Sequence, residues 1–372
     1  MNIGIDLINY YVPKYYLDHS LLAKERGIDE DKFKIGIGQH KMAIISPLED
    51  IVTMALEAAY PIIGDDLETI DTLLFASESG IDFSKSAGNY VHSMLGLNPN
   101  VRILELKQAC YALTGALHLA CDYVRANPTK KALIVSSDVA WYGFDTPGEA
   151  TQGAGAVAML IAANPRIATV HKGQFTTDNF PDFYRPSYSD VPVVDGKLSI
   201  RCYTDLLKRV DPGMFYPYTC FHLPFANMAN KANKYLSHPM ADSHLEITKR
   251  LGKDIGNIYN GSIYLSLLSV LIYSEKTLEN QTIGMFSYGS GAMAEYFTLT
   301  LSKNYQTYIN KAQLISIVND RLPVDFETYV KYMTTFIEKE HATHYSPSDS
   351  DYNDHTFIID VIENGHRTYK KV

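Results

Sequence analysis

Cys110 is the residue of this sequence best placed to act as a nucleophile. It lies in the segment QACYA, residues 108–112, where a helical pattern is expected to begin. The positive end of a helix dipole lowers the pKa of a nearby thiol and so favours the reactive thiolate. The alternative is a buried structural cysteine, which is the usual environment of this residue type. Cys121, on the same predicted helix, has only this second explanation.

Glu78 is a candidate general base. It follows the apolar run 73–77, which we expect to be a buried strand, and it stands just before a loop that contains glycine. Burial raises the pKa of a carboxyl group because the charged form loses its hydration, and a raised pKa suits a base that works near neutral pH. A salt-bridged carboxylate on a surface loop is the alternative, and the residues alone leave both open.

His222 stands between the apolar residues Phe221 and Leu223. A satisfied core histidine is the ordinary explanation of such a position. However, a helical pattern starts near Pro224, so His222 is expected at a strand-to-helix turn, where α/β folds place their functional sites.

Asn257 precedes a helical pattern with little polar face, in a segment with two asparagines and two glycines within six residues. Helix capping explains one such asparagine, and a plain turn explains the rest. A role in the site remains the other interpretation. The remaining histidines lack the spacing of metal ligands, so we expect no metal site.

The elements that must position these residues follow from hydrophobic periodicity. Short apolar runs, bounded by turn residues, predict strands at 72–77, 132–137, 155–162, 283–287 and 293–301. Longer patterns predict helices at 109–124 and 261–273. The second of these helices has so little polar face that it must be buried on all sides. The alternation of the two kinds of element is typical of an α/β protein.

A short segment also occurs twice. The letters GAGAVA at 153–158 return as GSGAMA at 289–294, each time leading into an apolar strand. Chance similarity of two glycine turns is one explanation. The other is a duplicated α/β unit with its active site between the halves, lined by glycines that permit close backbone approach.

Composition limits the remaining choices. The chain of 372 residues, 46% hydrophobic and 20% charged, is long enough for two domains or one large duplicated unit. Its net charge of −9 argues against a nucleic-acid partner. No apolar stretch approaches the roughly 20 residues that span a bilayer, and no secretory signal is visible. Four cysteines without CxxC spacing indicate reduced thiols. We therefore expect a cytoplasmic protein with no membrane partner.

Taken together and in order, the segments of the chain resemble the hydroxymethylglutaryl-CoA synthase family, in its bacterial mevalonate-pathway form. The resemblance runs through nearly the whole chain. It rests on IGID at 3–6, YVPKYY at 11–16, IGIGQ at 35–39, ASES at 76–79, ACY at 109–111, GEATQGAG at 148–155, DFYRP at 182–186, FHLPF at 221–225, GNIY at 256–259 and SYGSG at 287–291.

The resemblance implies a thiolase-like αβαβα layered fold built from two similar halves. The first half, residues 1–165, would carry Glu78 and Cys110, and the second, residues 166–372, would carry His222 and Asn257. It also implies a homodimer.

The resemblance further implies an acyltransferase that condenses acetyl-CoA with acetoacetyl-CoA to 3-hydroxy-3-methylglutaryl-CoA. Cys110 would carry the acetyl group, Glu78 would deprotonate its methyl, and His222 would orient acetoacetyl-CoA. Both acyl-CoA molecules are substrates, and no cofactor is expected. The substrate contacts would come from Asp29, Tyr142, Thr151, Lys231, Asn257 and Ser290. Supporting positions around the pocket would be Tyr111, Asp138, Asp182 and Tyr288.

The sequence departs from the family at one position near the substrate. The family usually has a lysine five residues after the histidine, where this chain has Asn227, while Lys231 is present. We expect the two to share a helix face that offers CoA one ammonium group fewer. The segment 198–219 is also shorter than the family pattern.

Three alternatives remain from the sequence. An initiating ketoacyl synthase would use a Cys-His-Asn set and would not need Glu78. A polyketide β-branching synthase would condense onto a carrier protein. A catalytically inactive acyl-CoA binding protein of the same fold would not need Cys110, Glu78 and His222 intact.

Overall fold

The computed structural model describes residues 1–348 and 355–372. Its core is a nine-stranded sheet. The strands are β1 (Ile3–Tyr11), β4 (Ile70–Ala76), β5 (Arg102–Leu106), β6 (Lys131–Ala140), β7 (Gly153–Ala163), β8 (Ala168–Thr177), β11 (Thr219–Phe221), β12 (Thr282–Gly289) and β13 (Met293–Leu301). Their order across the sheet is β11-β12-β13-β8-β1-β7-β6-β4-β5.

The strand order repeats. In β1-β7-β6-β4, the first two neighbouring pairs are antiparallel and the last pair is parallel. The set β8-β13-β12-β11 has the same pattern of directions. The two sets meet through a short antiparallel contact between β1 and β8. The sheet therefore consists of two half-sheets with the same topology, and β5 extends the first as an edge strand.

The repeated glycine segment fits this duplication only loosely. Gly153 and Gly155 lie inside β7, whereas Gly289 ends β12 and Gly291 lies in the turn before β13. The segments accompany the equivalent strands β7 and β13 but at different registers. The duplication is thus visible in the strand order, and the similarity of the letters does not mark equivalent positions.

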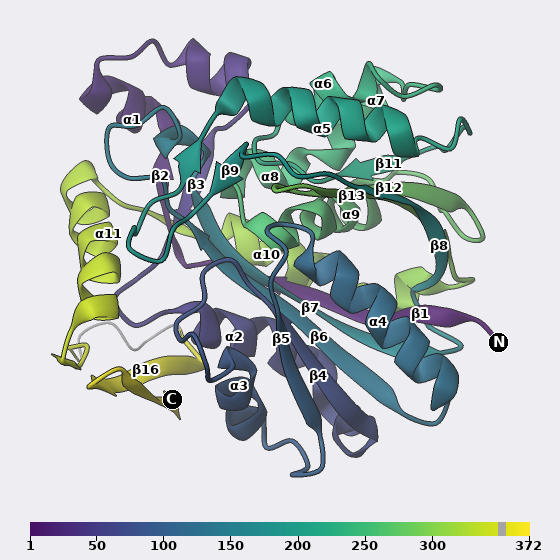
Figure 1. Cartoon of the computed structure of the whole chain (residues 1–372), viewed down its shortest axis with the longest axis horizontal. Helices are drawn as coiled ribbons and strands as arrows, with labels where there is room; N and C mark the ends of the chain where they lie inside the picture. Colours follow the sequence, from purple (N-terminus) through teal and green to yellow (C-terminus); the bar gives the residue numbers. More distant parts are fainter. Residues whose placement is uncertain (349–354) are drawn as a thin grey trace.

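Helices complete a five-layered arrangement (Figure 1). Helices α4 (Ala112–Ala126) and α9 (Ser262–Tyr273) share one hydrophobic cluster with strands of both half-sheets. Helices α2 (Ile51–Ile63) and α3 (Ala87–Leu95) pack with the first half-sheet on its other side. Helices α5 (Gly196–Val210) and α6 (Met228–Asn233) do the same for the second. The expected α/β fold with αβαβα layers is confirmed.

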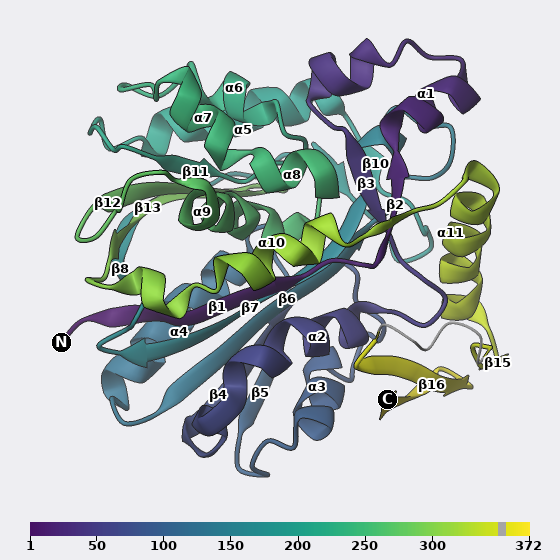
Figure 2. The ribbon, with the colours of Figure 1, turned by 180° about the vertical axis from the view of Figure 1, so that it is seen from behind.

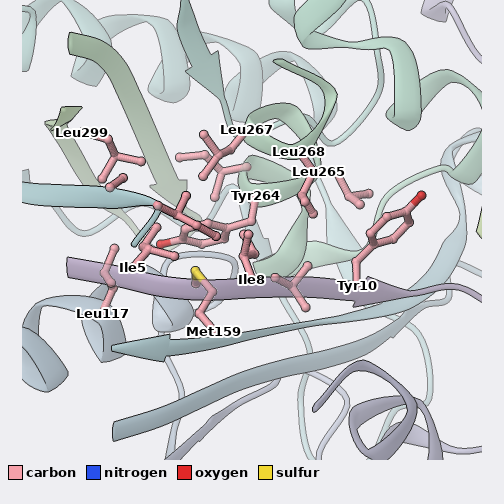
Figure 3. Packing of buried hydrophobic residues seen from close by; sticks show 14 of the residues in the cluster. Ile5, Ile8, Tyr10, Leu117, Met159, Tyr264, Leu265, Leu267, Leu268 and Leu299 are labelled. Carbon is pink, nitrogen blue, oxygen red and sulfur yellow. The ribbon is translucent and has the colours of Figure 1, made fainter. Parts of the chain in front are cut away.

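The central layer is held by close apolar packing. Every residue of α9 except Tyr273 is buried, as the sequence predicts. Figure 3 shows Leu265 and Leu268 of this helix above Ile8 of β1. The hydroxyl of Tyr264 lies 3.0 Å from that of Thr114, which gives the two central helices a polar contact inside this core.

The remaining elements surround this core. They are β2 (Tyr15–Asp18), β3 (Lys41–Ile44), β9 (Phe183–Tyr184), β10 (Val193–Val194), β14 (Leu322–Pro323), β15 (His344–Tyr345), β16 (Phe357–Glu363), β17 (His366–Lys371), α1 (His19–Arg26), α7 (Asp242–Thr248), α8 (Arg250–Ile255), α10 (Lys311–Asn319) and α11 (Phe326–His341). Figure 2 shows α10 along β1, where the Tyr10 hydroxyl donates to the carbonyl of Leu314 at 2.5 Å. Within the described ranges, no helix is long and apolar enough to cross a membrane.

All five predicted strands are confirmed, with ends that agree to within three residues. The predicted helix at 109–124 begins later than expected, at Ala112. Ala109 has a φ of 44°, in the left-handed region, so the chain turns there before it can enter a helix. Cys110 therefore precedes the helix.

Candidate active site

Cys110 and Glu78 are in direct contact. The Cys110 Sγ lies 2.8 Å from the Glu78 Oε1. Glu78 follows β4 and Cys110 follows β5, and these neighbouring strands are parallel, so both residues lie at the same edge of the sheet. The topology thus brings together two groups that are 32 residues apart in the sequence.

Burial governs the electrostatics of this pair. Loss of hydration, together with the nearby Asp138, raises the pKa of Glu78 to about 8, as the sequence predicts in direction. Loss of hydration and the adjacent Glu78 also raise the pKa of the Cys110 thiol well above its usual value. The expected lowering of the Cys110 pKa by a helix dipole is wrong. Cys110 lies before the first turn of α4, and its desolvation beside a carboxyl group has the larger effect.

Asp138 of β6 fixes the turn that carries Glu78. Its Oδ1 accepts the backbone N–H of Glu78 at 2.7 Å and the hydroxyl of Ser77 at 3.0 Å. Its Oδ2 accepts the side-chain amide of Asn260, from the other half of the molecule, at 3.1 Å. Burial raises the pKa of Asp138 to about 6. The sequence did not single out Asn260, although it is the second asparagine of the 256–262 segment.

Aromatic side chains enclose Cys110. Tyr142, Phe183 and Tyr259 pack edge to face, with ring centroids 6.0 to 6.3 Å apart, in one cluster with Cys110. Of these, the sequence assigned a role only to Tyr142. The others could have been found from their places in the DFYRP and GNIY segments. Such an apolar cluster shields the thiol from water.

Asn257 has the turn role that the sequence offered, and its side chain also reaches the aromatic cluster beside Cys110. Its Oδ1 accepts the backbone N–H of Tyr259 and the hydroxyl of Ser262, each at 2.9 Å, as a turn residue does. Its Nδ2 donates to the hydroxyl of Tyr142 at 3.1 Å, within the aromatic cluster. Its backbone N–H donates to the carbonyl of Thr151 at 3.0 Å. The structure thus places Tyr142, Thr151 and Asn257 together.

Asp182 holds the turn between β12 and β13. The hydroxyl of Tyr288 donates to its Oδ2 at 2.7 Å, and the backbone N–H of Gly291 donates to its Oδ1 at 3.0 Å. This turn contains Ser290. At its start, a side chain on Gly289 would lie 2.5 Å from the carbonyl oxygen of Gln108. Only glycine permits this approach, which places the turn against the loop of Cys110.

His222 directly follows β11, as predicted, although α6 begins only at Met228. Its backbone N–H donates to the carbonyl of Phe286 at 2.9 Å, and its own carbonyl accepts a hydrogen bond from the hydroxyl of Tyr203 at 2.8 Å. The side chain is buried, and its Nδ1 has no hydrogen-bond partner within the described structure. Burial lowers the pKa of His222 to about 3, so the ring is neutral near pH 7. Because β11 is equivalent to β4, His222 and Glu78 occupy corresponding sheet ends.

Asp29 and Lys231 lie away from this cluster. Asp29 is exposed in the loop after α1, and Lys231 is exposed on α6. Asn227 directly precedes α6 and connects the two regions, because its Nδ2 donates to the carbonyl of Ile35 at 2.8 Å. Its Oδ1 accepts from the Lys249 ammonium at 3.0 Å. The Asn227 side chain is therefore committed to internal contacts and does not lie free beside Lys231.

The five-layered fold with two equivalent half-sheets places the chain among the thiolase-like α/β proteins. The chain belongs to the hydroxymethylglutaryl-CoA synthase family. The family models for the N-terminal and C-terminal parts of hydroxymethylglutaryl-coenzyme A synthase match residues 1–166 and 224–371.

Individual relatives agree with this assignment. The hydroxymethylglutaryl-CoA synthase of Enterococcus faecalis is 39% identical over 347 residues, which cover 88% of this chain and 91% of the relative. The polyketide biosynthesis 3-hydroxy-3-methylglutaryl-ACP synthase of Bacillus subtilis is 32% identical, with 80% of each chain covered. A crystal structure of an HMG-CoA synthase complexed with CoA superposes over 100% of both chains, with a TM-score of 0.93 and 36% identity.

Proposed function

We propose that this protein condenses acetyl-CoA with acetoacetyl-CoA to 3-hydroxy-3-methylglutaryl-CoA, the reaction of its family in the mevalonate pathway. The observation that carries the proposal is the Cys110 thiol 2.8 Å from the Glu78 carboxyl, whose pKa is about 8. A ketoacyl synthase of the Cys-His-Asn type has no use for this carboxyl group. An inactive acyl-CoA binding protein would not need a thiol and a carboxyl group in direct contact.

The first step is acyl transfer. The Cys110 sulfur attacks the thioester carbonyl of acetyl-CoA, the bond to the CoA sulfur breaks, and the thiol proton leaves with CoA. The aromatic cluster around Cys110 keeps water from the new thioester while it waits for the second substrate.

Glu78 acts in the second step. In the free protein, the hydrogen bond from Cys110 favours the ionised form of Glu78. An acetylated sulfur cannot donate this bond, so Glu78 becomes a stronger base when its substrate is in place. Its carboxylate removes a proton from the acetyl methyl, and the carbanion attacks the ketone carbon of acetoacetyl-CoA. The resulting alkoxide takes up one proton.

His222 would serve the second substrate. With a pKa of about 3 it is a neutral imidazole, which can donate a hydrogen bond to the ketone oxygen but carries no charge. Water then hydrolyses the thioester, which releases the product and restores the Cys110 thiol. We propose that these steps need only protein side chains, the two acyl-CoA substrates and water, and so no cofactor.

Two groups of residues would bind the substrates. Tyr142, Thr151 and Asn257 form one connected unit beside Cys110, with Ser290 in the turn packed on its loop. Asp29 and Lys231 are exposed on adjoining segments. We assign the first group to the acyl end and the second to the charged end of CoA.

We further propose that the protein is a homodimer. We also propose that it is cytoplasmic and that the boundary between its two thiolase-like halves lies near residue 165. The dimer is supported by β5, an edge strand that pairs on one side with β4 and has no partner strand on its other side within the described residues. Its Leu104 is 54% exposed. On neighbouring segments, Phe83 is 92% and Leu119 is 53% exposed. An apolar face beside a free strand edge is typical of a protein interface. Sedimentation analysis should give a dimer, and Leu104→Lys should shift it towards monomer.

Labelled acetyl-CoA tests the main proposal. The protein is incubated with it, unreacted ligand is removed, and acetoacetyl-CoA is added. The proposal predicts an acetyl adduct on Cys110 and then labelled 3-hydroxy-3-methylglutaryl-CoA, identified by mass. Acetoacetyl groups on a carrier protein serve as the parallel acceptor. Turnover with the carrier substrate alone would overturn the proposal in favour of the β-branching activity.

A further inference from the structure

Glu295 is a buried carboxylate that the reaction steps do not use. It lies on β13, in the second half of the chain, and is 4% exposed. Its Oε2 accepts the hydroxyl of Tyr111 at 2.6 Å, and its Oε1 lies 2.9 Å from the Nε2 of His118. Both partners belong to the first half, so Glu295 joins the two halves beside the nucleophile.

Tyr111 is the residue next to Cys110, and its side chain is fixed on several sides. The ring lies against α4, where a side chain on Gly115 would come within 3.3 Å of it. The backbone N–H of Tyr111 lies so near Gly289 that a side chain there would be 2.8 Å away. The hydroxyl of Tyr111 donates a hydrogen bond to the Glu295 carboxylate. The position of Tyr111 therefore determines how the Cys110 backbone leaves the left-handed residue Ala109 and enters α4.

His118 completes the arrangement from the next turns of α4. Its ring packs edge to face on Phe297, with centroids 5.2 Å apart, and this contact directs its Nε2 towards Glu295. A buried carboxylate is costly unless polar hydrogens face it. Tyr111 supplies one at Oε2, whereas the Nε2 of His118 lies 2.9 Å from Oε1 without the geometry of a hydrogen bond. The Tyr111 hydroxyl therefore fixes the orientation of the carboxylate.

We propose that Glu295 is a positioning residue for the nucleophile. Through its hydrogen bond with Tyr111, it holds the Cys110 loop at the distance and angle at which the sulfur meets the acyl carbonyl. This inference rests on the proposed function, since it concerns the acetylation of Cys110. It predicts that the loss of Glu295 slows acetylation in protein that is still folded and still binds CoA.

Four variants test the inference. Glu295→Leu removes the acceptor, Glu295→Gln keeps an oxygen that Tyr111 can reach, and Tyr111→Phe removes the donor. The matched control is Tyr123→Phe. Tyr123 also donates its hydroxyl to a carboxylate, that of Asp71, but it lies near the C-terminal end of α4, whereas Tyr111 directly precedes the helix. The measurements are the single-turnover rate of Cys110 acetylation, the Kd of CoA and the melting temperature.

Glu295→Leu and Tyr111→Phe should lower the acetylation rate about tenfold, the expected scale for one lost hydrogen bond to a charged group. The Kd of CoA should stay within about twofold. Glu295→Gln should recover most of the rate, and Tyr123→Phe should match the unchanged protein. A wild-type rate in Glu295→Leu would overturn the inference, as would a slowed rate in Tyr123→Phe that equals it. Unchanged protein that forms no acetyl adduct would instead overturn the proposed function.

Discussion

Asp138 accepts the backbone N–H of Glu78 at 2.7 Å, across the parallel strands β6 and β4. The same carboxylate is one cause of the raised pKa of Glu78. One buried group therefore both places the general base and makes it more basic.

Asp138→Asn separates these two effects. Without the negative charge, the pKa of Glu78 should fall, so the pH at which condensation reaches half of its maximum should move to lower values. The plateau rate should drop about tenfold, because an amide replaces a carboxylate that accepts several hydrogen bonds. Condensation rates from pH 5.5 to 9.5 check this. An unchanged pH of half-maximal condensation, together with a lower plateau rate, would show that Asp138 only supports the turn.

The unchanged protein should show the titration of Glu78 directly. A base acts in its ionised form, so condensation by the preformed acetyl-enzyme should rise with pH and reach half of its maximum at about pH 8 or above. Below that point the rate should fall about tenfold per pH unit. Rapid mixing of acetyl-enzyme with acetoacetyl-CoA measures this. A rate that is flat from pH 6 to 9 would mean that Glu78 keeps the ordinary pKa of a carboxyl group, about 4.3.

His222→Ala should affect the second substrate more than the first. The neutral ring is buried with a free Nδ1, so its removal takes away a hydrogen bond to the ketone and leaves the Cys110 thiol untouched. Acetylation should stay within about threefold, and condensation should fall about 10²-fold or more. Separate single-turnover measurements of the two steps decide it. Equal loss in both steps would make His222 a structural residue.

Asn227→Lys should weaken acyl-CoA binding, and this reverses the expectation from the sequence. From the sequence, we interpreted Asn227 as the loss of a lysine that would bind CoA. In the structure its side chain holds the carbonyl of Ile35 and accepts from Lys249, so a lysine would break these contacts and face a like charge. The KM for acetoacetyl-CoA should rise severalfold, with little change in kcat. Asn230→Ala, which also removes a partner of Lys249, is the control. A lower KM at low ionic strength would restore the original expectation.

Hydrophobic periodicity was sufficient for the α/β class and for individual elements, because it needs no contact information, whereas the five-layered arrangement followed from the family resemblance. Helix α9 shows this, since twelve residues with almost no polar side chain could only form a buried helix. The raised pKa of Glu78 agrees with one of the two interpretations that the residues left open, in which an apolar strand that ends in a carboxylate places that group in a desolvated position.

The environment of Cys110 could not be predicted in this way. The left-handed conformation of Ala109 delays the helix, and no sequence pattern marks it. The contact between Cys110 and Glu78, and that between Tyr111 and Glu295, join strands whose pairing the periodicity does not determine. The sign of the Cys110 pKa shift depends on these contacts, which is why the expectation from the helix dipole failed.

Single-turnover measurements of acetylation and condensation in Glu78→Ala and Cys110→Ala test most directly whether Cys110 is the nucleophile and Glu78 is the general base. Glu78 raises the pKa of the thiol, so its removal should leave acetylation of Cys110 intact. Condensation should fall about 10²–10⁴-fold, because the variant lacks the carboxylate that takes the methyl proton. Cys110→Ala should gain no acetyl mass. The account predicts a stable acetyl-enzyme in Glu78→Ala that does not react with acetoacetyl-CoA. A Glu78→Ala protein that condenses at the normal rate, or a Cys110→Ala protein that still becomes acetylated, would contradict it.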